Sequence, residues 1–128
     1  MKKEEIKGMV ERLEKAAEGL ARYCHAEGCE DIWDCPLYHR KCSRKLGLDT
    51  AIAWEMATEL AYTCDILKKD PPWPRDRIKA SFFIASALFR IVYHHSDEFP
   101  KLWSLVGIGY DVLSWVYNKL EEEGAWEG

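Results

Sequence analysis

Residues 81–93 read SFFIASALFRIVY, thirteen positions with one charged side chain, Arg90. A helix built from them, with its flanks about residues 75–95, is apolar on most of its circumference, and such helices are normally enclosed by others. The run is too short to cross a bilayer, which takes about 20 residues. We therefore expect it to be the central, most enclosed element of an all-helical fold.

Three further segments, residues 3–24, 50–69 and 100–123, repeat apolar side chains at helical spacing. Their stripes are Ile6, Val10, Leu13, Ala17, Leu20 and Cys24; Ala53, Met56, Leu60, Cys64 and Leu67; and Leu102, Leu105, Val106, Leu113, Val116 and Leu120. Strand signals are missing. The sequence predicts an all-α bundle of four long helices in a single domain, residues 1–128.

The connections of this bundle are also indicated by sequence. Asp49 is expected to cap the second long helix, and the run Asp70-Pro-Pro-Trp-Pro to end it, because proline cannot continue a helix. Gly107 and Gly109 inside the last helix predict a close approach to a neighbouring helix. A short cysteine-rich insert, residues 24–47, lies between the first two long helices and predicts a short helix from Pro36 to Gly47.

Composition limits the classes of function. The 128 residues have a formal net charge of −4, which argues against wholesale electrostatic binding of nucleic acid or of an anionic membrane. The densely charged N-terminus is not a signal peptide, so a cytoplasmic protein is expected. Glutamine is absent and asparagine occurs once, a bias of hyperthermophile proteins that suggests an archaeal source.

Four of the five cysteines lie close together, at Cys24, Cys29, Cys35 and Cys42. Three chemistries fit such a cluster: a structural zinc ion, an iron–sulfur cluster held by all four thiolates, or two disulfides, which hyperthermophiles tolerate inside the cell. Zinc is favoured. On a helix from Pro36, residues 35, 39 and 42 share one face, so Cys42 and His39 are alternative fourth ligands, and an all-thiolate set favours Cys42.

The segment CHAEGCEDIWDCPLYH, residues 24–39, resembles a CCCH zinc finger in the order of its ligands and in the aromatic residue between the last two. In that family, zinc orders a small loop whose aromatic and basic side chains bind single-stranded RNA. The resemblance implies that Tyr38 or Trp33 stacks on bases and that basic neighbours contact phosphates. Those basic residues are Arg40, Lys41, Arg44 and Lys45.

An enzymatic alternative is carried by Arg90-x4-His95, which resembles the Arg-x4–6-His signature of HEPN ribonucleases, also helical bundles. The resemblance implies that Arg90 and His95 are catalytic and that paired subunits cleave RNA by acid–base chemistry. The plainer interpretation is that histidines close the third helix, where they suit its negative pole.

The remaining cysteine and the tryptophans have structural interpretations. Cys64 is expected to pack in the core as a small apolar residue. Three of the six tryptophans are expected in the core or at an interface, and two others near prolines or the tail are expected to be exposed and available to a homodimer. The first group is Trp54, Trp103 and Trp115; the second is Trp73 and Trp126.

The sequence contains no convincing catalytic constellation. We interpret the chain as a small helical binding module stabilised by a metal, with zinc favoured and a single-stranded nucleic acid or a protein as partner. Three alternatives stay open: an iron–sulfur protein with a redox-sensing or structural cluster, a HEPN-like ribonuclease, and a disulfide-stapled interaction protein.

Overall fold

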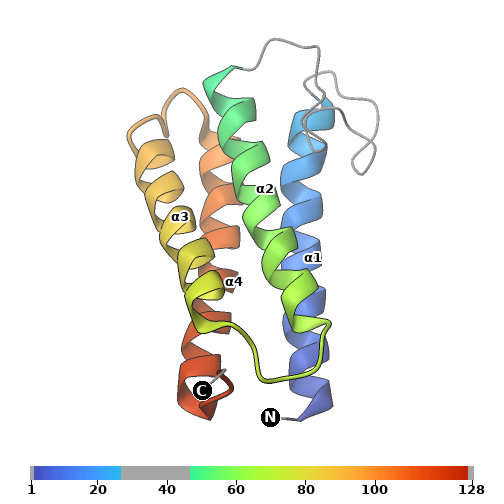
Figure 1. The fold of residues 1–128 in the computed structure, drawn as a ribbon. Coiled ribbons are helices and arrows are strands. Elements are labelled where there is room, and N and C mark those ends of the chain that lie inside the picture. Colours follow the sequence, from blue (N-terminus) through green and yellow to red (C-terminus); the bar gives the residue numbers. More distant parts are fainter. Residues whose placement is uncertain (1, 27–46, 127–128) are drawn as a thin grey trace.

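A computed structural model describes residues 2–26 and 47–126 of the chain. Four helices, α1 (Lys3–Ala26), α2 (Leu48–Leu67), α3 (Arg75–Tyr93) and α4 (Pro100–Glu123), run alternately up and down side by side (Figure 1). The described residues form no strand. The structure confirms the predicted all-α bundle of four long helices; the short helix predicted from Pro36 to Gly47 lies outside the described residues.

The second helix begins two residues earlier than the sequence suggested. Gly47 is its N-cap, and the Thr50 hydroxyl accepts a hydrogen bond from the Gly47 N–H at 3.0 Å. The prediction that Asp49 caps this helix is wrong. Asp49 lies inside the first turn, where its Oδ2 accepts a 2.7 Å hydrogen bond from the Tyr23 hydroxyl of α1. A carboxylate at this position also suits the positive pole of the helix.

The other helix ends follow local chemistry. Pro74 precedes α3, and His94 is its C-cap, so the helix ends two residues before the predicted end at residue 95. Pro100 occupies the first turn of α4, where its missing N–H costs no hydrogen bond. Gly124 ends α4 in the left-handed conformation, with φ of 60°, which favours glycine.

The apolar stripes meet in one core. The stripe of α2 is buried as predicted, and so are those of α1 and α4 except for Ile6, Val10 and Leu105, which are partly buried at the edge of the core. Within the described chain α2 and α4 each approach all three other helices, whereas α1 and α3 do not approach each other. The bundle therefore has one short diagonal, between α2 and α4.

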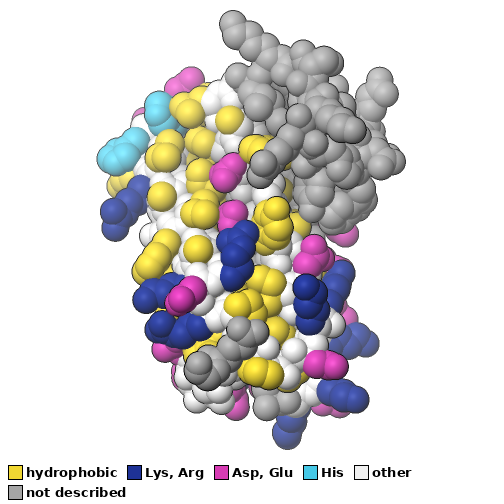
Figure 2. All heavy atoms as spheres, in the orientation of Figure 1, with side chains coloured by type: hydrophobic (Ala, Val, Ile, Leu, Met, Phe, Trp, Pro, Cys, Tyr) yellow, Lys and Arg dark blue, Asp and Glu magenta, His cyan; other side chains and the backbone are white. Residues whose placement is uncertain are grey.

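The prediction that α3 is the most enclosed helix is wrong. Ten residues of α2 are buried but only four of α3, and Phe83 of α3 keeps 57% of its surface exposed. Ile91 and Tyr93 are exposed as well, and Figure 2 shows hydrophobic side chains along the α3 side of the molecule. Because α3 packs only against α2 and α4, the side of the helix turned away from both stays in solvent.

One carboxylate is buried between α2 and α3. Glu59 is only 4% exposed and accepts a 2.9 Å hydrogen bond from the Ser81 hydroxyl. The Arg77 guanidinium lies 3.5 Å from the same oxygen and stacks over the Tyr62 ring at 4.7 Å. A buried charge needs such partners, because an unpaired one costs several kcal/mol. This polar contact fixes how α3 lies on α2.

The prediction that Trp73 is exposed is also wrong, since only 1% of its surface is accessible to solvent. The proline-rich connection turns back under the bundle, as Figure 1 shows near the C-terminus. There the Trp73 N–H donates to the Ala125 carbonyl at 3.1 Å, and its indole N–H donates to the Lys69 carbonyl at 3.0 Å. The prolines end α2 as predicted. The Trp73 side chain that follows them packs against the end of the bundle core and is buried there.

Gly109 confirms the predicted close approach. A Cβ placed on it would lie 3.1 Å from Met56 Cε and 3.2 Å from Leu60 Cδ1 of α2, tighter than ordinary contacts. Gly8 of α1 offers the opposite case, because nothing lies within 4 Å of a Cβ placed there. The short diagonal of the bundle therefore depends on the missing side chain at position 109.

We expect Gly109→Leu to lower the free energy of unfolding by about 1–3 kcal/mol, because the added side chain forces α4 away from α2. Gly8→Leu should raise it by up to about 0.8 kcal/mol, since leucine is the better helix former and meets no neighbour. Urea denaturation of both variants measures the difference. An equal response at the two glycines would contradict the role assigned to Gly109.

Candidate functional site

The end of α1 and the start of α2 meet at one corner of the bundle. The Cys24 thiol donates to the Thr50 carbonyl at 3.8 Å, one residue along from the contact between Tyr23 and Asp49. Cys24 is buried, as its place on the apolar stripe predicted. The end of α1 and the start of α2, which flank residues 27–46 in the sequence, are therefore held together by the bundle itself.

Most residues of the predicted metal and nucleic-acid sites lie outside the described residues. These are the ligands Cys29, Cys35, His39 and Cys42, and the nucleic-acid residues Trp33, Tyr38, Arg40, Lys41, Arg44 and Lys45. Among residues 2–26 and 47–126, no three metal-binding side chains come together. Cys24 is thus the one proposed ligand whose surroundings the structure describes.

Arg90 lies in the last turn of α3, and His95 lies in the turn that follows the helix. Arg90 is exposed, and His95 Nδ1 lies 3.3 Å from Glu98 Oε2 in the turn that leads to α4. His94 ends the helix by donating its backbone N–H to the Arg90 carbonyl at 3.3 Å. The helix-ending role of the histidines is therefore confirmed, and RNA cleavage lost in His95→Ala stays a prediction.

Cys64 of α2 packs in the bundle core as expected. Two charged residues that the sequence did not indicate, Glu14 and Lys68, lie beside it. Its thiol donates to Glu14 Oε1 of α1 at 3.6 Å and to the Val10 carbonyl at 3.8 Å. The Lys68 ammonium lies 2.9 Å from the same Glu14 oxygen and, by hydrogen bonding, lowers the pKa of Glu14. Burial raises the pKa of Cys64 to about 11, so the thiol stays neutral and is a poor nucleophile.

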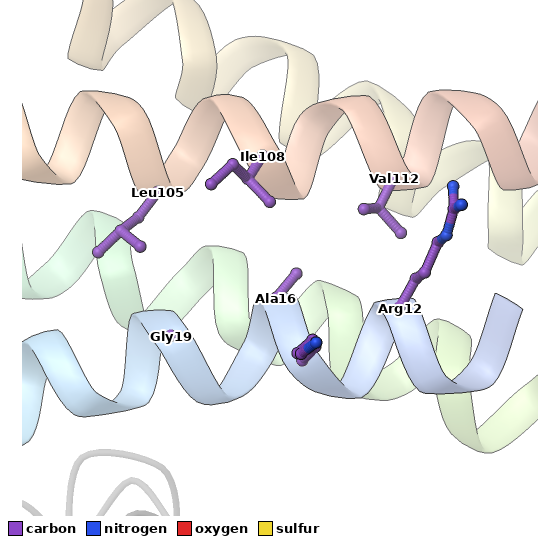
Figure 3. A pocket seen from close by; sticks show the side chains of 7 residues that line it. Arg12, Ala16, Gly19, Leu105, Ile108 and Val112 are labelled. Carbon is purple, nitrogen blue, oxygen red and sulfur yellow. The ribbon is translucent and has the colours of Figure 1, made fainter. Parts of the chain in front are cut away.

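A groove runs between α1 and α4 on the surface of the bundle. Figure 3 shows Leu105, Ile108 and Val112 extending from α4 towards α1, with Ala16 and Gly19 on the opposite side. The hollow has a volume of about 290 Å³ and is lined almost entirely by carbon. Because Ala16 and Gly19 are small, α1 leaves open space where larger side chains would close the gap.

Two cations border this groove on the α1 side, Arg12 and Lys15. The Arg12 guanidinium lies 4.5 Å from the centre of the Trp115 ring, a cation–π contact that bridges α1 and α4. Nothing in the sequence indicates that Arg12, Lys15 and Ile108 line a common groove. Their spacing identifies which helix face each occupies, but which face of α1 meets α4 is known only from the fold.

No protein-family model, curated protein or solved structure matches this chain. None of the four described helices has the length and apolar character needed to cross a membrane.

We expect the Cys64 thiol to resist alkylation by iodoacetamide at about pH 8 in the folded protein, because it is buried and protonated. Peptide mass mapping reports the modification of Cys64 separately from that of the other cysteines. The same reaction in concentrated guanidinium is the control, and there Cys64 should be modified fully. Rapid native modification would show that the core opens at this position.

Proposed function

We propose that the chain is a non-enzymatic helical binding module in which one metal ion, zinc by preference, holds the segment between α1 and α2. The observation that carries the proposal is the corner where this segment starts and ends. Hydrogen bonds from Tyr23 to Asp49 and from Cys24 to Thr50 hold the two helix ends together. The sequence between these helix ends contains three further cysteines, Cys29, Cys35 and Cys42.

The proposed ligands are Cys24, Cys29, Cys35 and Cys42, with His39 as the alternative fourth. Four thiolates form a closed tetrahedral site, which is typical of structural rather than catalytic zinc. A ligating Cys24 is deprotonated and cannot donate a hydrogen bond, so metal binding exchanges its contact with the Thr50 carbonyl for a bond to the metal. That contact is long, at 3.8 Å, and its loss costs little.

The metal's contribution on this proposal is to order the segment, since metal binding free energy becomes folding free energy. Nucleic acid is the proposed partner, contacted by Tyr38 and by the basic residues that follow it. The basic run 40–45 is a local exception in a chain of net charge −4, so binding is confined to this segment. An iron–sulfur cluster or a pair of disulfides would order the same segment, and metal analysis separates the three.

Protein purified without oxygen should contain one zinc ion per chain and absorb no visible light. Cys29→Ala and Cys35→Ala should each lose the metal and melt at a lower temperature, because structural zinc stabilises the fold that binds it. Cys64→Ala is the matched control: it removes a cysteine from the core and should keep the metal. Elemental analysis and thermal unfolding followed by circular dichroism measure both properties.

Unchanged metal content and melting in both cluster variants would contradict the proposal. Iron with sulfide and brown absorbance would assign an iron–sulfur cluster, and thiols that titrate only after reduction would assign disulfides. Cys24→Ser adds a test of the ligand set. If this variant keeps its zinc, Cys24 is a packing residue and the proposed set is wrong.

We expect Lys41→Glu/Lys45→Glu to weaken binding of a fluorescent single-stranded RNA at least about tenfold at low salt, because two phosphate contacts become repulsive. The control, Lys69→Glu/Lys79→Glu, makes the same change in net charge on α2–α3 and should leave binding unchanged. Fluorescence anisotropy over a range of salt concentrations measures both. Equal weakening by the two variants would show that only net charge matters.

A further inference from the structure

The groove between α1 and α4 has an apolar floor that solvent still reaches. Ile108, at its centre, keeps 52% of its surface exposed, and Trp115, one turn beyond Val112, keeps 38%. Exposed side chains of this size, aligned beside a hollow, are typical of an interaction surface. Leaving them uncovered in water is unfavourable, by about 25 cal/mol for each Å².

The charged side chains that line the groove are both cations of α1, Arg12 and Lys15. In the part of the chain that the structure describes, neither has a carboxylate within ion-pair distance. Stacking on Trp115 leaves the N–H edge of Arg12 able to donate. The α1 edge of the groove is therefore cationic, and its α4 side is formed by the apolar residues Leu105, Ile108 and Val112.

The dimensions of the groove favour an extended ligand, such as a peptide, over a small molecule that is enclosed on all sides. A volume of about 290 Å³ is at the lower limit of ligand pockets, which bury most of the molecule they hold. This groove lies open along its length, from Arg12 to Gly19, about 10 Å at 1.5 Å per residue. Two turns of an α-helix cover that length, with apolar anchors at positions i, i+4 and i+7.

We propose that the α1–α4 groove binds an amphipathic helix of a partner protein, with acidic side chains on the edge that faces α1. Its apolar anchors cover Ile108 and Trp115 and fill the space above Ala16 and Gly19. Its carboxylates pair with Arg12 and Lys15, and its other edge is uncharged. The interaction is separate from the proposed metal segment, since the groove residues belong to α1 and α4 alone.

The probe is a fluorescein-labelled helical peptide with leucines at i, i+4 and i+7, glutamates on one side of them and glutamines on the other. Its matched copy has lysines in place of the glutamates. The acidic peptide should bind the full chain, and Arg12→Glu/Lys15→Glu should weaken it at least about tenfold and reverse the preference to the basic copy. Ile108→Asp should weaken both peptides.

The control variant is Lys69→Glu/Lys79→Glu, which changes the net charge equally away from the groove and should bind like the wild type. Circular dichroism verifies that each variant is folded. Anisotropy that shows no binding, a preference for the basic peptide, or groove variants equal to the control would overturn the proposal.

Two other occupants would overturn it as well. If dodecanoate binds in an Ile108-dependent manner and the peptide does not, the groove is a fatty-acid site. If sedimentation equilibrium gives a dimer that Ile108→Asp dissociates, a second copy of the chain fills it.

Discussion

Gly109 lies where α4 packs against Met56 and Leu60 of α2, and the absence of a side chain there allows these two helices to come close together. Met56 and Leu60 fill the space that a Cβ would take. When one diagonal of a four-helix bundle is short, the other is long, so α1 and α3 lie on opposite sides without approaching each other. Both outer helices then keep apolar surface in solvent: the Phe83 side of α3, and the groove that α1 shares with α4.

Two polar contacts join neighbouring helices of the bundle. Glu59 and Ser81 join α3 to α2, and Tyr23 and Asp49 join α1 to α2 at the corner where residues 27–46 begin and end. Such bonds add little net stability each, about 1 kcal/mol, but their geometry is specific. They fix the register of helices whose apolar contacts alone allow sliding. The candidate chemistry therefore lies outside the core, at the corner of the bundle and along its α1–α4 edge.

Part of the candidate site could be predicted from sequence. The spacing of Cys24 on an apolar stripe indicated a buried thiol, and its neighbours in sequence indicated a cluster. The groove could not be predicted in this way. Arg12, Lys15 and Ile108 belong to helices far apart in the chain, and their significance comes from which faces meet. The burial of Trp73 was missed for the same reason, since its cover comes from Ala125 at the other end of the chain.

Sequence by itself determined the number of helices, their boundaries to within two residues and the stripes that form the core, because helical period, proline and glycine act locally. It also indicated that Gly109 needs a close neighbour. Only the tertiary structure decided which helix is enclosed. The thirteen-residue run of α3 is the most apolar stretch, yet α2 is the more buried helix, since burial depends on how many neighbours a helix has. The hydrophobicity of a helix determines how favourable its burial would be, whereas the arrangement of the neighbouring helices determines how much of it is buried.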